Sequence, residues 1–404
     1  MKILMINKFF YKKGGAETYF FSLAEALKKD GHEIIFFSMK HPQNYSCEQE
    51  KYFVSNSEYN NKVNILKKIK MFKNFSWSKE AQKNIEKLIV NEKPEIALLS
   101  NIHRQLTCSI IPVLKKYKIK IVMTVHDLIT ICPSYTMLNG KNQICEKCLH
   151  GSAFNCVKNK CIKNSYIKSY LGYLENKKCK KENVYNLIDL YICPSNFYKN
   201  KLLESKITES PIIQLSNPTT LTTKFELKNG EYFLYIGRLT KEKGLFTLID
   251  AMKKTNSKLL IVGTGLLDTK LKNYIVDNEL VNKVQMLGYK TGSELSSIIK
   301  NSKAVILPSE WYENGPYSAI EAMAYSKPLI VSNVGGLPEM VDDNVNGYVF
   351  DMLNVEMLSD CINKMQNLSL NDYSSMCLAS YKKYKTNYCM ENYVKSLINY
   401  ILKL

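Results

Sequence analysis

The chain has 404 residues, of which 45% are hydrophobic and 23% charged, as is ordinary for a soluble globular protein. At about 150 residues per domain, this length predicts two or three domains, each large enough to bury a hydrophobic core. No apolar run approaches the ~18 residues needed to cross a bilayer, and Met1–Ile6 lacks the cleavage site of a signal peptide, so we expect a cytoplasmic protein.

The formal net charge of +19 is concentrated in the first half of the chain. Residues 1–215 hold 35 Lys and Arg against 18 Asp and Glu, a net charge of +17, whereas residues 216–404 carry only +2. A lysine-rich proteome would enrich both halves alike. The asymmetry therefore predicts an acidic partner for the first half, such as anionic lipid headgroups, a lipid diphosphate or nucleic acid.

The first elements form a βαβ unit. A strand at Lys2–Ile6 precedes the pair Gly14-Gly15, a helix at Ala16–Lys29 and a second strand at His32–Phe37. The glycine pair stands at the helix N-terminus, where a diphosphate could rest on unpaired amides. A plain tight turn explains the pair equally well, and the full G-x-G-x-x-G spacing of dinucleotide-binding loops is absent.

Residues 61–90 are rich in lysine, with apolar side chains between the lysines at helical spacing. Two interpretations remain open, a helix lying on a membrane surface and a domain helix with a solvated basic face.

Two further buried strands are predicted at Pro94–Leu99 and Ile119–Val125, flanking a helix near 105–117. His126 and Asp127 follow the second strand directly. Ligands of open α/β sheets collect at the carboxyl ends of the strands, so His126 is a candidate site residue. A structural hydrogen-bonding role is the alternative.

A cysteine-rich segment spans 132–161. Four of its cysteines follow the pattern C-x2-C-x7-C-x4-C: Cys145, Cys148, Cys156 and Cys161. In a cytosolic chain, four thiolates at such spacing suit a structural zinc ion better than disulfides. Cys132 or His150 could replace one of these ligands, and unrelated reduced thiols are the alternative.

A second alternation of strands and helices begins at Tyr232–Ile236, after the polar stretch Thr219–Asn229, where we predict the interdomain linker. Arg238 and Lys243 bracket the loop that follows this strand. Two cations at a strand end could neutralise a diphosphate, although a solvated loop explains them as well.

The stretch between the predicted strands Lys303–Pro308 and Pro328–Ser332 holds one helix, with Gly315 before it. The first N–H groups of a helix have no partner within the helix and favour anions. Glu313 in the loop and Glu321 in the helix could bind hydroxyl groups of a phosphorylated sugar. Acidic residues beside a helix N-terminus also occur without a ligand.

Five motifs, taken in order, carry a family resemblance: Gly14-Gly15-Ala16-Glu17, His126-Asp127, Gly237-Arg238-x4-Lys243-Gly244, Glu313-x7-Glu321 and Val334-Gly-Gly-Leu-Pro-Glu339. With them the chain resembles glycosyltransferase family 4, and within it the glycosyltransferases of bacterial surface polysaccharides. The resemblance implies a retaining enzyme of GT-B architecture, an α/β protein with two doubly wound Rossmann-like domains facing a cleft.

The resemblance also implies a division of labour along the chain. Residues 1–217 would form an acceptor-side domain that carries the cysteine-rich segment as a variable loop. Residues 218–383 would bind the nucleotide sugar, and residues 384–404 would form a helix crossing back to the first domain.

Site roles follow from the matching positions. Arg238 and Lys243 would hold the diphosphate, and Glu321 would bind the ribose. Glu313 and His126 would contact the transferred sugar, and Gly15 would let the backbone approach the diphosphate. The remaining donor-binding candidates are Asn314, Gly315, Pro316 and Tyr317. Many family members have Phe-Gly where this chain has Gly315-Pro316-Tyr317, and glycine is usual at Ser326.

The activity implied is transfer of a hexose from a UDP- or GDP-sugar to a glycan or lipid-linked acceptor at the inner face of the cell membrane. Two cations and helix N-termini would stabilise the leaving diphosphate, so we expect no catalytic cofactor, and zinc only in a structural role. We expect contact with an anionic membrane surface and none with nucleic acid. The alternatives are a sugar-nucleotide epimerase or phosphorylase of the same fold, and a zinc-stabilised nucleic-acid-binding module at 60–165.

Overall fold

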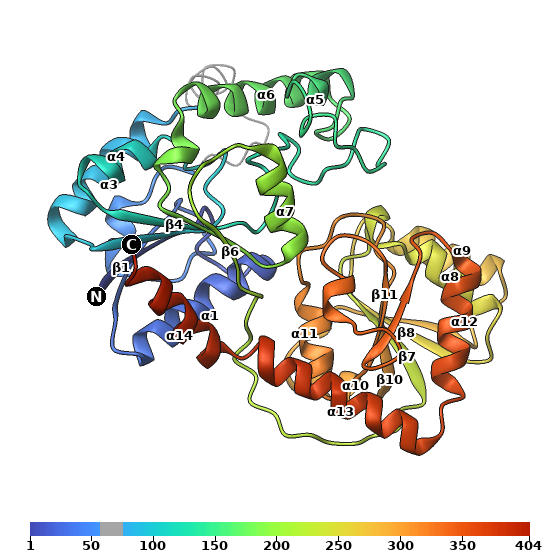
Figure 1. The fold of residues 1–404 in the computed structure, drawn as a ribbon. Coiled ribbons are helices and arrows are strands. Elements are labelled where there is room, and N and C mark those ends of the chain that lie inside the picture. Colours follow the sequence, from blue (N-terminus) through green and yellow to red (C-terminus); the bar gives the residue numbers. More distant parts are fainter. Residues whose placement is uncertain (57–75) are drawn as a thin grey trace. The chain divides into compact units, whose positions relative to one another are not determined.

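The computed structural model describes residues 1–56 and 76–404. The chain forms two compact units, each built around its own sheet (Figure 1). Unit 1 comprises Met1–Ser216 together with Tyr393–Leu404, and unit 2 comprises Asn217–Asn392. The predicted α/β class with two doubly wound parallel sheets is confirmed.

Unit 1 contains a six-stranded parallel sheet in the order β2-β1-β3-β4-β5-β6. Its strands are β1 (Lys2–Ile6), β2 (Glu33–Phe37), β3 (Ile96–Leu99), β4 (Lys120–Thr124), β5 (Leu190–Cys193) and β6 (Ile212–Gln214). The apolar strands are buried almost throughout, as a sheet covered by helices on both faces requires.

The helices of unit 1 connect these strands. They are α1 (Gly15–Lys29), α3 (Lys79–Glu92), α4 (Ile110–Lys116), α5 (Asn155–Lys158), α6 (Tyr166–Lys181) and α7 (Asn196–Ser205), with short 3-10 turns η1 (Glu48–Tyr52) and η2 (Val184–Leu187). Serine hydroxyls accept from backbone N–H groups at three helix starts: Ser78, Ser165 and Ser195.

Two local predictions in unit 1 differ from the structure. The helix expected near 105–117 begins only at Ile110, because Arg104 and Thr107 adopt left-handed backbone angles that a helix does not accept. Within the lysine-rich stretch 61–90, the part from residue 79 onward is α3, which buries Ala81 and Ile85 as a domain helix does. Residues 57–75 lie outside the described part, so the membrane-helix interpretation is untested there.

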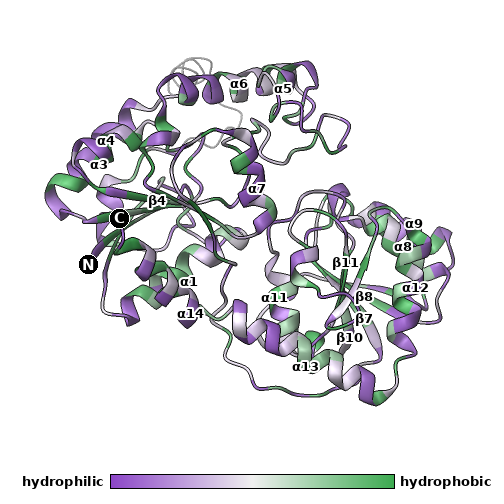
Figure 2. Cartoon of the chain, in the orientation of Figure 1, coloured by the Kyte–Doolittle hydropathy of each residue, from purple (hydrophilic) through white to green (hydrophobic). Residues whose placement is uncertain are grey.

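Unit 2 contains a second six-stranded parallel sheet, in the order β12-β11-β10-β7-β8-β9. Its strands are β7 (Tyr232–Ile236), β8 (Lys258–Val262), β9 (Val284–Gly288), β10 (Ser302–Leu307), β11 (Leu329–Ser332) and β12 (Gly347–Phe350). Strand β10 is buried along its whole length. Apolar residues concentrate in the strands of both sheets, while the helices mix polar and apolar residues (Figure 2).

The helices of unit 2 cover both faces of this sheet. They are α8 (Leu245–Lys253), α9 (Asp268–Asp277), α10 (Gly292–Lys300), α11 (Tyr317–Ala324), α12 (Val355–Gln366) and α13 (Leu370–Asn387), with 3-10 turns η3 (Lys241–Lys243) and η4 (Pro338–Met340). The last helix, α14 (Met390–Ile401), belongs to unit 1 from Tyr393 onward. Among the described residues, no helix has both the length and the apolar character of a membrane span.

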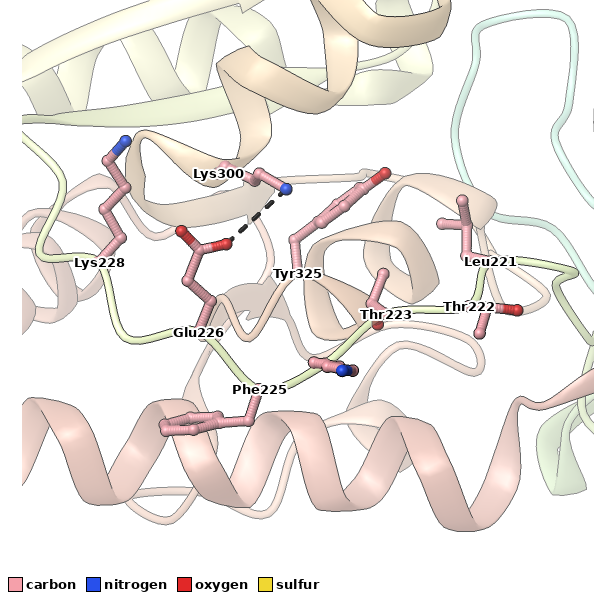
Figure 3. Close-up of a pocket in the computed structure, with 9 residues that line it drawn as sticks. Leu221, Thr222, Thr223, Phe225, Glu226, Lys228, Lys300 and Tyr325 are labelled. Carbon is pink, nitrogen blue, oxygen red and sulfur yellow. Dashed lines mark ion pairs between the residues drawn. The ribbon is translucent and has the colours of Figure 1, made fainter.

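The stretch predicted as a linker, Thr219–Asn229, is bound along unit 2. Tyr381 donates a hydrogen bond to the carbonyl of Thr223 at 2.6 Å, and the hydroxyl of Thr223 donates to the carbonyl of Ala324 at 2.6 Å. A pocket of about 480 Å³ lies beside this stretch (Figure 3). An ion pair between Lys300 and Glu226, 3.7 Å apart, crosses it.

Candidate active site

The loop that follows β7 is pressed against the end of β10. Gly244, at φ 68°, ends the turn η3 inside this loop. A Cβ atom at this position would overlap the carbonyl of Pro308, so the close approach of the two strand ends requires glycine. This contact brings the basic loop of β7 to the acidic stretch after β10.

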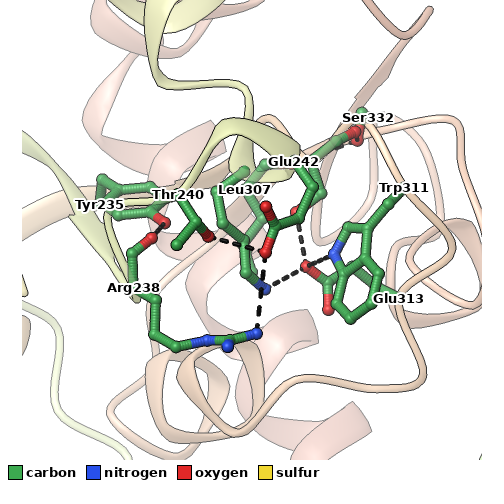
Figure 4. Close-up of polar contacts among 10 residues, drawn as sticks. Tyr235, Arg238, Thr240, Glu242, Leu307, Trp311, Glu313 and Ser332 are labelled. Atoms are coloured by element: carbon green, nitrogen blue, oxygen red, sulfur yellow. Dashed lines mark hydrogen bonds and ion pairs between the residues drawn. The ribbon is translucent and has the colours of Figure 1, made fainter. Parts of the chain in front are cut away.

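Lys243 and Glu313 form the centre of the site (Figure 4). The Nζ atom of Lys243 lies 2.6 Å from Oε1 of Glu313, and the two side chains are only 14% and 7% exposed. The same carboxylate oxygen accepts hydrogen bonds from Ser309 Oγ at 2.6 Å and from Trp311 Nε1 at 2.8 Å. The second oxygen, Oε2, takes no part in these three bonds.

The environment of Glu313 stabilises its charged form. Burial alone would raise the pKa of this carboxyl, but the charge of Lys243 and the hydrogen bonds from Lys243, Ser309 and Trp311 outweigh it and lower the pKa. Lys243 also lies over the indole ring of Trp311, 5.2 Å from its centroid. The site therefore holds a fixed, buried pair of opposite charges.

Arg238 belongs to the same loop but extends into solvent. Its side chain is 68% exposed, and its nearest acidic contact is 3.8 Å away at Oε1 of Glu242 (Figure 4). Glu242 is held in turn by the hydroxyl of Thr240 at 2.7 Å. Tyr235 donates to the carbonyl of Arg238 at 2.9 Å, which fixes the backbone but leaves the guanidinium available for a ligand.

The loop before α11 is anchored by the chain that enters unit 2. Nδ2 of Asn217 donates to the carbonyls of Asn314 and Gly315 at 3.3 and 3.1 Å. Gly315 adopts φ 73°, a left-handed conformation that favours glycine, and Pro316 is the N-cap of the helix that starts at Tyr317. The four donor-binding candidates 314–317 thus surround a helix N-terminus, as predicted.

Glu321 lies one turn into α11 and is not part of the Lys243–Glu313 network. Burial raises the pKa of its carboxyl to about 7. A buried carboxyl that has lost its water is stabilised when a hydroxyl group hydrogen-bonds to it. Glu321 is therefore suited to bind a sugar diol.

In unit 1, the glycine pair begins α1 as predicted. Gly14 is the N-cap and Gly15 is the first helical residue. The adjacent side chain of Glu17 is buried and accepts a hydrogen bond from Asn7 Nδ2 at 3.2 Å. The loop after β1 and the first turn of α1 are therefore joined.

His126 lies two residues after the end of β4, at the carboxyl end of the sheet. Its ring meets that of Tyr19 edge-on, with centroids 4.8 Å apart. Burial lowers the pKa of His126 to about 4, so the imidazole is neutral at pH 7. A neutral ring at this position could form hydrogen bonds with a sugar without carrying charge.

A charged cluster near His126 was not predicted. The backbone N–H of Arg104 donates to Oε1 of Glu175 at 2.6 Å, and burial raises the pKa of Glu175 to about 7. Burial also lowers the pKa of Lys8, although the nearby charge of Asp127 acts in the opposite direction and raises it. Lys8 and Arg104 follow β1 and β3, so the strand-end rule could have identified them, whereas nothing in the sequence singles out Glu175 on α6.

All five cysteines of the segment 132–161 are free thiols. Three are buried, Cys132, Cys148 and Cys156, while Cys145 and Cys161 are half-buried. The segment belongs to unit 1 and precedes α6.

Models of known protein families match nearly the whole chain. Residues 13–222 match the model described as Glycosyltransferase Family 4, and residues 220–383 match that of Glycosyl transferases group 1. The two family models therefore cover both units, and they meet close to Asn217, where unit 2 begins.

Curated relatives agree with this assignment. The chain is 25% identical over 357 residues to an uncharacterized 42.6 kDa protein in the cps region of Klebsiella pneumoniae, covering 84% of this chain and 87% of that protein. It is 30% identical over 219 residues to an uncharacterized glycosyltransferase of Methanocaldococcus jannaschii, covering 54% and 57%. It is 26% identical over 246 residues to the Escherichia coli UDP-Gal:alpha-D-GlcNAc-diphosphoundecaprenol alpha-1,3-galactosyltransferase, covering 57% and 62%.

Solved structures share the fold. A glycosyltransferase from Rickettsia africae aligns with a TM-score of 0.69 at 20% identity, covering 98% of this chain and 97% of that one. The Anabaena protein HepE, solved in complex with UDP, aligns with a TM-score of 0.69 at 15% identity over the full length of both chains. The chain belongs to glycosyltransferase family 4 and has the GT-B fold.

Proposed function

We propose that this glycosyltransferase transfers a sugar, with retention of anomeric configuration, from a nucleoside-diphosphate sugar to a glycan or lipid-linked acceptor in surface polysaccharide biosynthesis. The observation that carries the proposal is the buried pair Lys243–Glu313, because Lys243 shares its loop with the exposed guanidinium of Arg238 and Glu313 lies in the loop that leads to the N-terminus of α11. These groups offer cations for a diphosphate beside a carboxylate for a sugar.

The geometry of the pair divides these tasks between its two members. An ammonium has three donors, and one of those on Lys243 is directed at Oε1 of Glu313. The other two would bind diphosphate oxygens. Oε1 of Glu313 already accepts three hydrogen bonds, so Oε2 would accept those of the transferred sugar.

Charge stabilisation would supply most of the catalysis. As the bond from the sugar to the diphosphate breaks, negative charge grows on the leaving group. Lys243 and the amides at the start of α11 are held in place before the reaction, so they would stabilise this charge with little reorganisation. The exposed side chain of Arg238 would add a second cation. The leaving diphosphate would accept the proton of the acceptor hydroxyl on the same face of the sugar, which gives retention.

The relatives favour UDP over GDP as the donor nucleotide. The name of the E. coli relative specifies UDP-Gal and a diphosphoundecaprenol acceptor, and HepE was solved with UDP and with UDP-glucose. The Klebsiella relative lies in a cps region. We therefore propose a UDP-hexose donor and a lipid diphosphate acceptor.

A lipid-linked acceptor requires that the enzyme reach a membrane, and α6 offers a surface for this contact. Tyr166, Ile167 and Tyr170 are 57%, 67% and 47% exposed at the start of this helix. The ammonium of Lys160 lies 4.4 Å from the ring centroid of Tyr166, and Lys168 is exposed beside it. Aromatic side chains flanked by lysines suit the headgroup region of an anionic bilayer, so we propose that this face docks on the inner side of the cell membrane.

The donor can be tested by incubating the full chain with UDP- and GDP-sugars and following thermal unfolding. We expect a UDP-hexose to raise the unfolding temperature and a GDP-sugar not to. NMR of the product should show the anomeric configuration of the donor, and inversion would refute retention. Formation of a new sugar nucleotide without acceptor would identify an epimerase instead.

The membrane contact can be tested by sedimentation with vesicles. We expect the chain to sediment with vesicles containing anionic lipid and not with purely zwitterionic ones. The double variant Tyr166→Ser/Ile167→Ser should lose this binding, whereas Leu266→Ser, which removes a side chain 92% exposed in unit 2, should not. Equal binding by both variants would refute the assignment to α6.

A further inference from the structure

The cysteine-rich segment has only a small apolar core of its own. Within residues 132–161, the buried hydrophobic side chains other than cysteine are Met137, Leu138, Ala153 and Val157. The segment's regular structure consists of the single turn α5 and one bridge between Leu138 and Ile144. So small a core does not hold a chain of this length in one conformation, and such segments are usually stapled by disulfides or metals.

The backbone of the segment is also strained. Four of its residues other than glycine adopt left-handed angles, Tyr135, Met137, Asn142 and Lys160, and Lys163 and Asn164 just after it do so too. Each of these conformations costs about 1 kcal/mol relative to a right-handed one. Something other than local preference must therefore hold the loop.

The cysteines occupy the centre of this loop. Cys132, Cys148 and Cys156 are 5%, 8% and 0% exposed. The backbone N–H of Cys161 donates to the carbonyl of Cys156 at 3.0 Å, which closes the last turn and brings these two side chains together. The N–H of Cys145 donates to the carbonyl of Met137 at 2.8 Å, which places the Cys145–Cys148 turn beside the chain that follows Cys132.

Polar contacts place two of the sulfur atoms. Sγ of Cys132 lies 3.1 Å from Ser134 Oγ, and Sγ of Cys148 lies 3.8 Å from the carbonyl oxygen of Ala153. The backbone N–H of Cys156 donates to the same carbonyl at 3.1 Å, so Cys148 and Cys156 meet at one turn.

We propose that Cys132, Cys148, Cys156 and Cys161 bind one structural Zn²⁺ ion that holds this segment in place. Four thiolates in a closed set are typical of structural zinc sites. This set differs in one member from the spacing-based prediction, since Cys132 replaces Cys145.

Burial supports this choice of ligands. Cys132 is 5% exposed, whereas Cys145 is half-buried. Structural zinc sites are closed to solvent, so Cys132 suits the site better than Cys145.

Another group of potential ligands lies nearby. The ligand atoms of Glu146, His150 and Glu204 lie within 4.8 Å of one another, closer than any three sulfur atoms among the described cysteines. However, Lys201 contacts both glutamates at 2.8 and 3.0 Å and already supplies a cation. Metal binding by the thiols would draw the four side chains inward.

The test is elemental analysis of the full chain, purified without a polyhistidine tag or chelator. We expect about one Zn²⁺ per chain. The variants Cys132→Ser and Cys156→Ser should lose the metal, whereas Cys145→Ser and the matched control Cys47→Ser, outside the segment, should keep it. Wild type without zinc, or zinc lost from Cys145→Ser and kept by Cys132→Ser, would overturn the proposal.

A second measurement covers variants that fail to fold. Wild-type protein with cobalt in place of zinc should show the visible absorption of a tetrahedral thiolate complex. Peptide mapping under non-reducing conditions should find no Cys156–Cys161 disulfide in zinc-loaded protein. A disulfide at this position, or cobalt absorption typical of oxygen and nitrogen ligands, would refute the thiolate site, the latter in favour of the Glu146 group.

Discussion

The Nζ atom of Lys243 lies 2.6 Å from Oε1 of Glu313, although the two residues are 70 positions apart. They come from the loops after β7 and β10, which are neighbours in the sheet. Gly335, at φ 63°, lets the following loop cover Glu313, since a Cβ there would lie 2.5 Å from the backbone nitrogen of Glu313. The pair is thus enclosed by backbone as well as by side chains.

Removing one member of this pair should cost more stability than removing both. Lys243→Met leaves the Glu313 carboxylate buried without its counter-ion, and we expect a loss of about 3 kcal/mol in the free energy of unfolding. The double variant Lys243→Met/Glu313→Gln should lose less than Lys243→Met alone. Urea unfolding can be followed by Trp311 fluorescence in a Trp77→Phe background, because these are the two tryptophans and each unit holds one.

The same variants separate catalysis from folding. Glu313→Gln should reduce turnover by about two orders of magnitude or more if the carboxylate contacts the sugar in the transition state. Near-normal turnover in Glu313→Gln would contradict the assigned site. A stability of Lys243→Met within about 0.5 kcal/mol of wild type would contradict the enclosed pair.

Arg238 should affect binding without affecting stability. Its side chain is 68% exposed and its ion pair with Glu242 is 3.8 Å long, so Arg238→Ala should change the free energy of unfolding by less than about 0.5 kcal/mol. Donor affinity should fall roughly tenfold or more, since a charge-assisted phosphate contact is lost. Calorimetry with UDP measures this loss.

Lys241→Ala is the matched control, because Lys241 is an exposed cation of the same loop. Equal losses of UDP affinity in the two variants would show that only the general charge of the loop matters.

Much of the architecture could be predicted because strands and glycine-rich turns carry local signals. The strand at Lys2–Ile6 and the strand at Tyr232–Ile236 have the predicted bounds, since an apolar run beside a turn is sufficient evidence for a buried strand. Gly315 and Pro316 also indicated where the loop would meet α11.

The contacts made within the site could not be predicted in the same way. Ser309 and Trp311 both lie shortly before Glu313 in sequence, yet nothing local shows that both donate to the same oxygen. Glu175 joins its cluster from α6 through a contact with Arg104 that depends on tertiary packing alone. The segment around Cys132 has no periodicity, so its conformation also could not be predicted from pattern.

Glu321 should make the stability of unit 2 depend on pH. Its pKa is raised from 4.5 to about 7 by burial, so the folded state holds the proton more tightly than the unfolded state. This contribution is fully present below about pH 4.5 and is lost as the pH rises through 7. The variant Glu321→Gln should lack this pH-dependent contribution to stability.

The measurement is urea unfolding of both proteins at pH 4.5 and 7.5. The drop between the two pH values should be about 3 kcal/mol larger in wild type than in Glu321→Gln. Glu175, whose pKa is also about 7, remains in both proteins, so the difference isolates Glu321. The same pH dependence in both proteins would show that this carboxyl is ionised in the folded state.

The stability of the last helix, α14, should depend on the hydrogen bond between two buried tyrosine hydroxyls. The hydroxyl of Tyr393 lies 2.6 Å from that of Tyr19, which also contacts Thr124 Oγ1 at 3.1 Å and meets the ring of His126. Tyr393→Phe removes the first bond and leaves the ring in place, so we expect unit 1 to lose about 1 kcal/mol of stability. Hydrogen exchange should become faster in α14 while β1 keeps its protection.

Tyr400→Phe provides the comparison, because Tyr400 lies on the same helix but is 37% exposed. Loss of the Tyr400 hydroxyl should leave hydrogen exchange in α14 unchanged. Faster exchange in Tyr400→Phe than in Tyr393→Phe would mean that exposed contacts, and not the buried pair with Tyr19, hold this helix. Since Tyr19 also packs against His126, Tyr393→Phe should in addition lower turnover if the position of that imidazole matters for transfer.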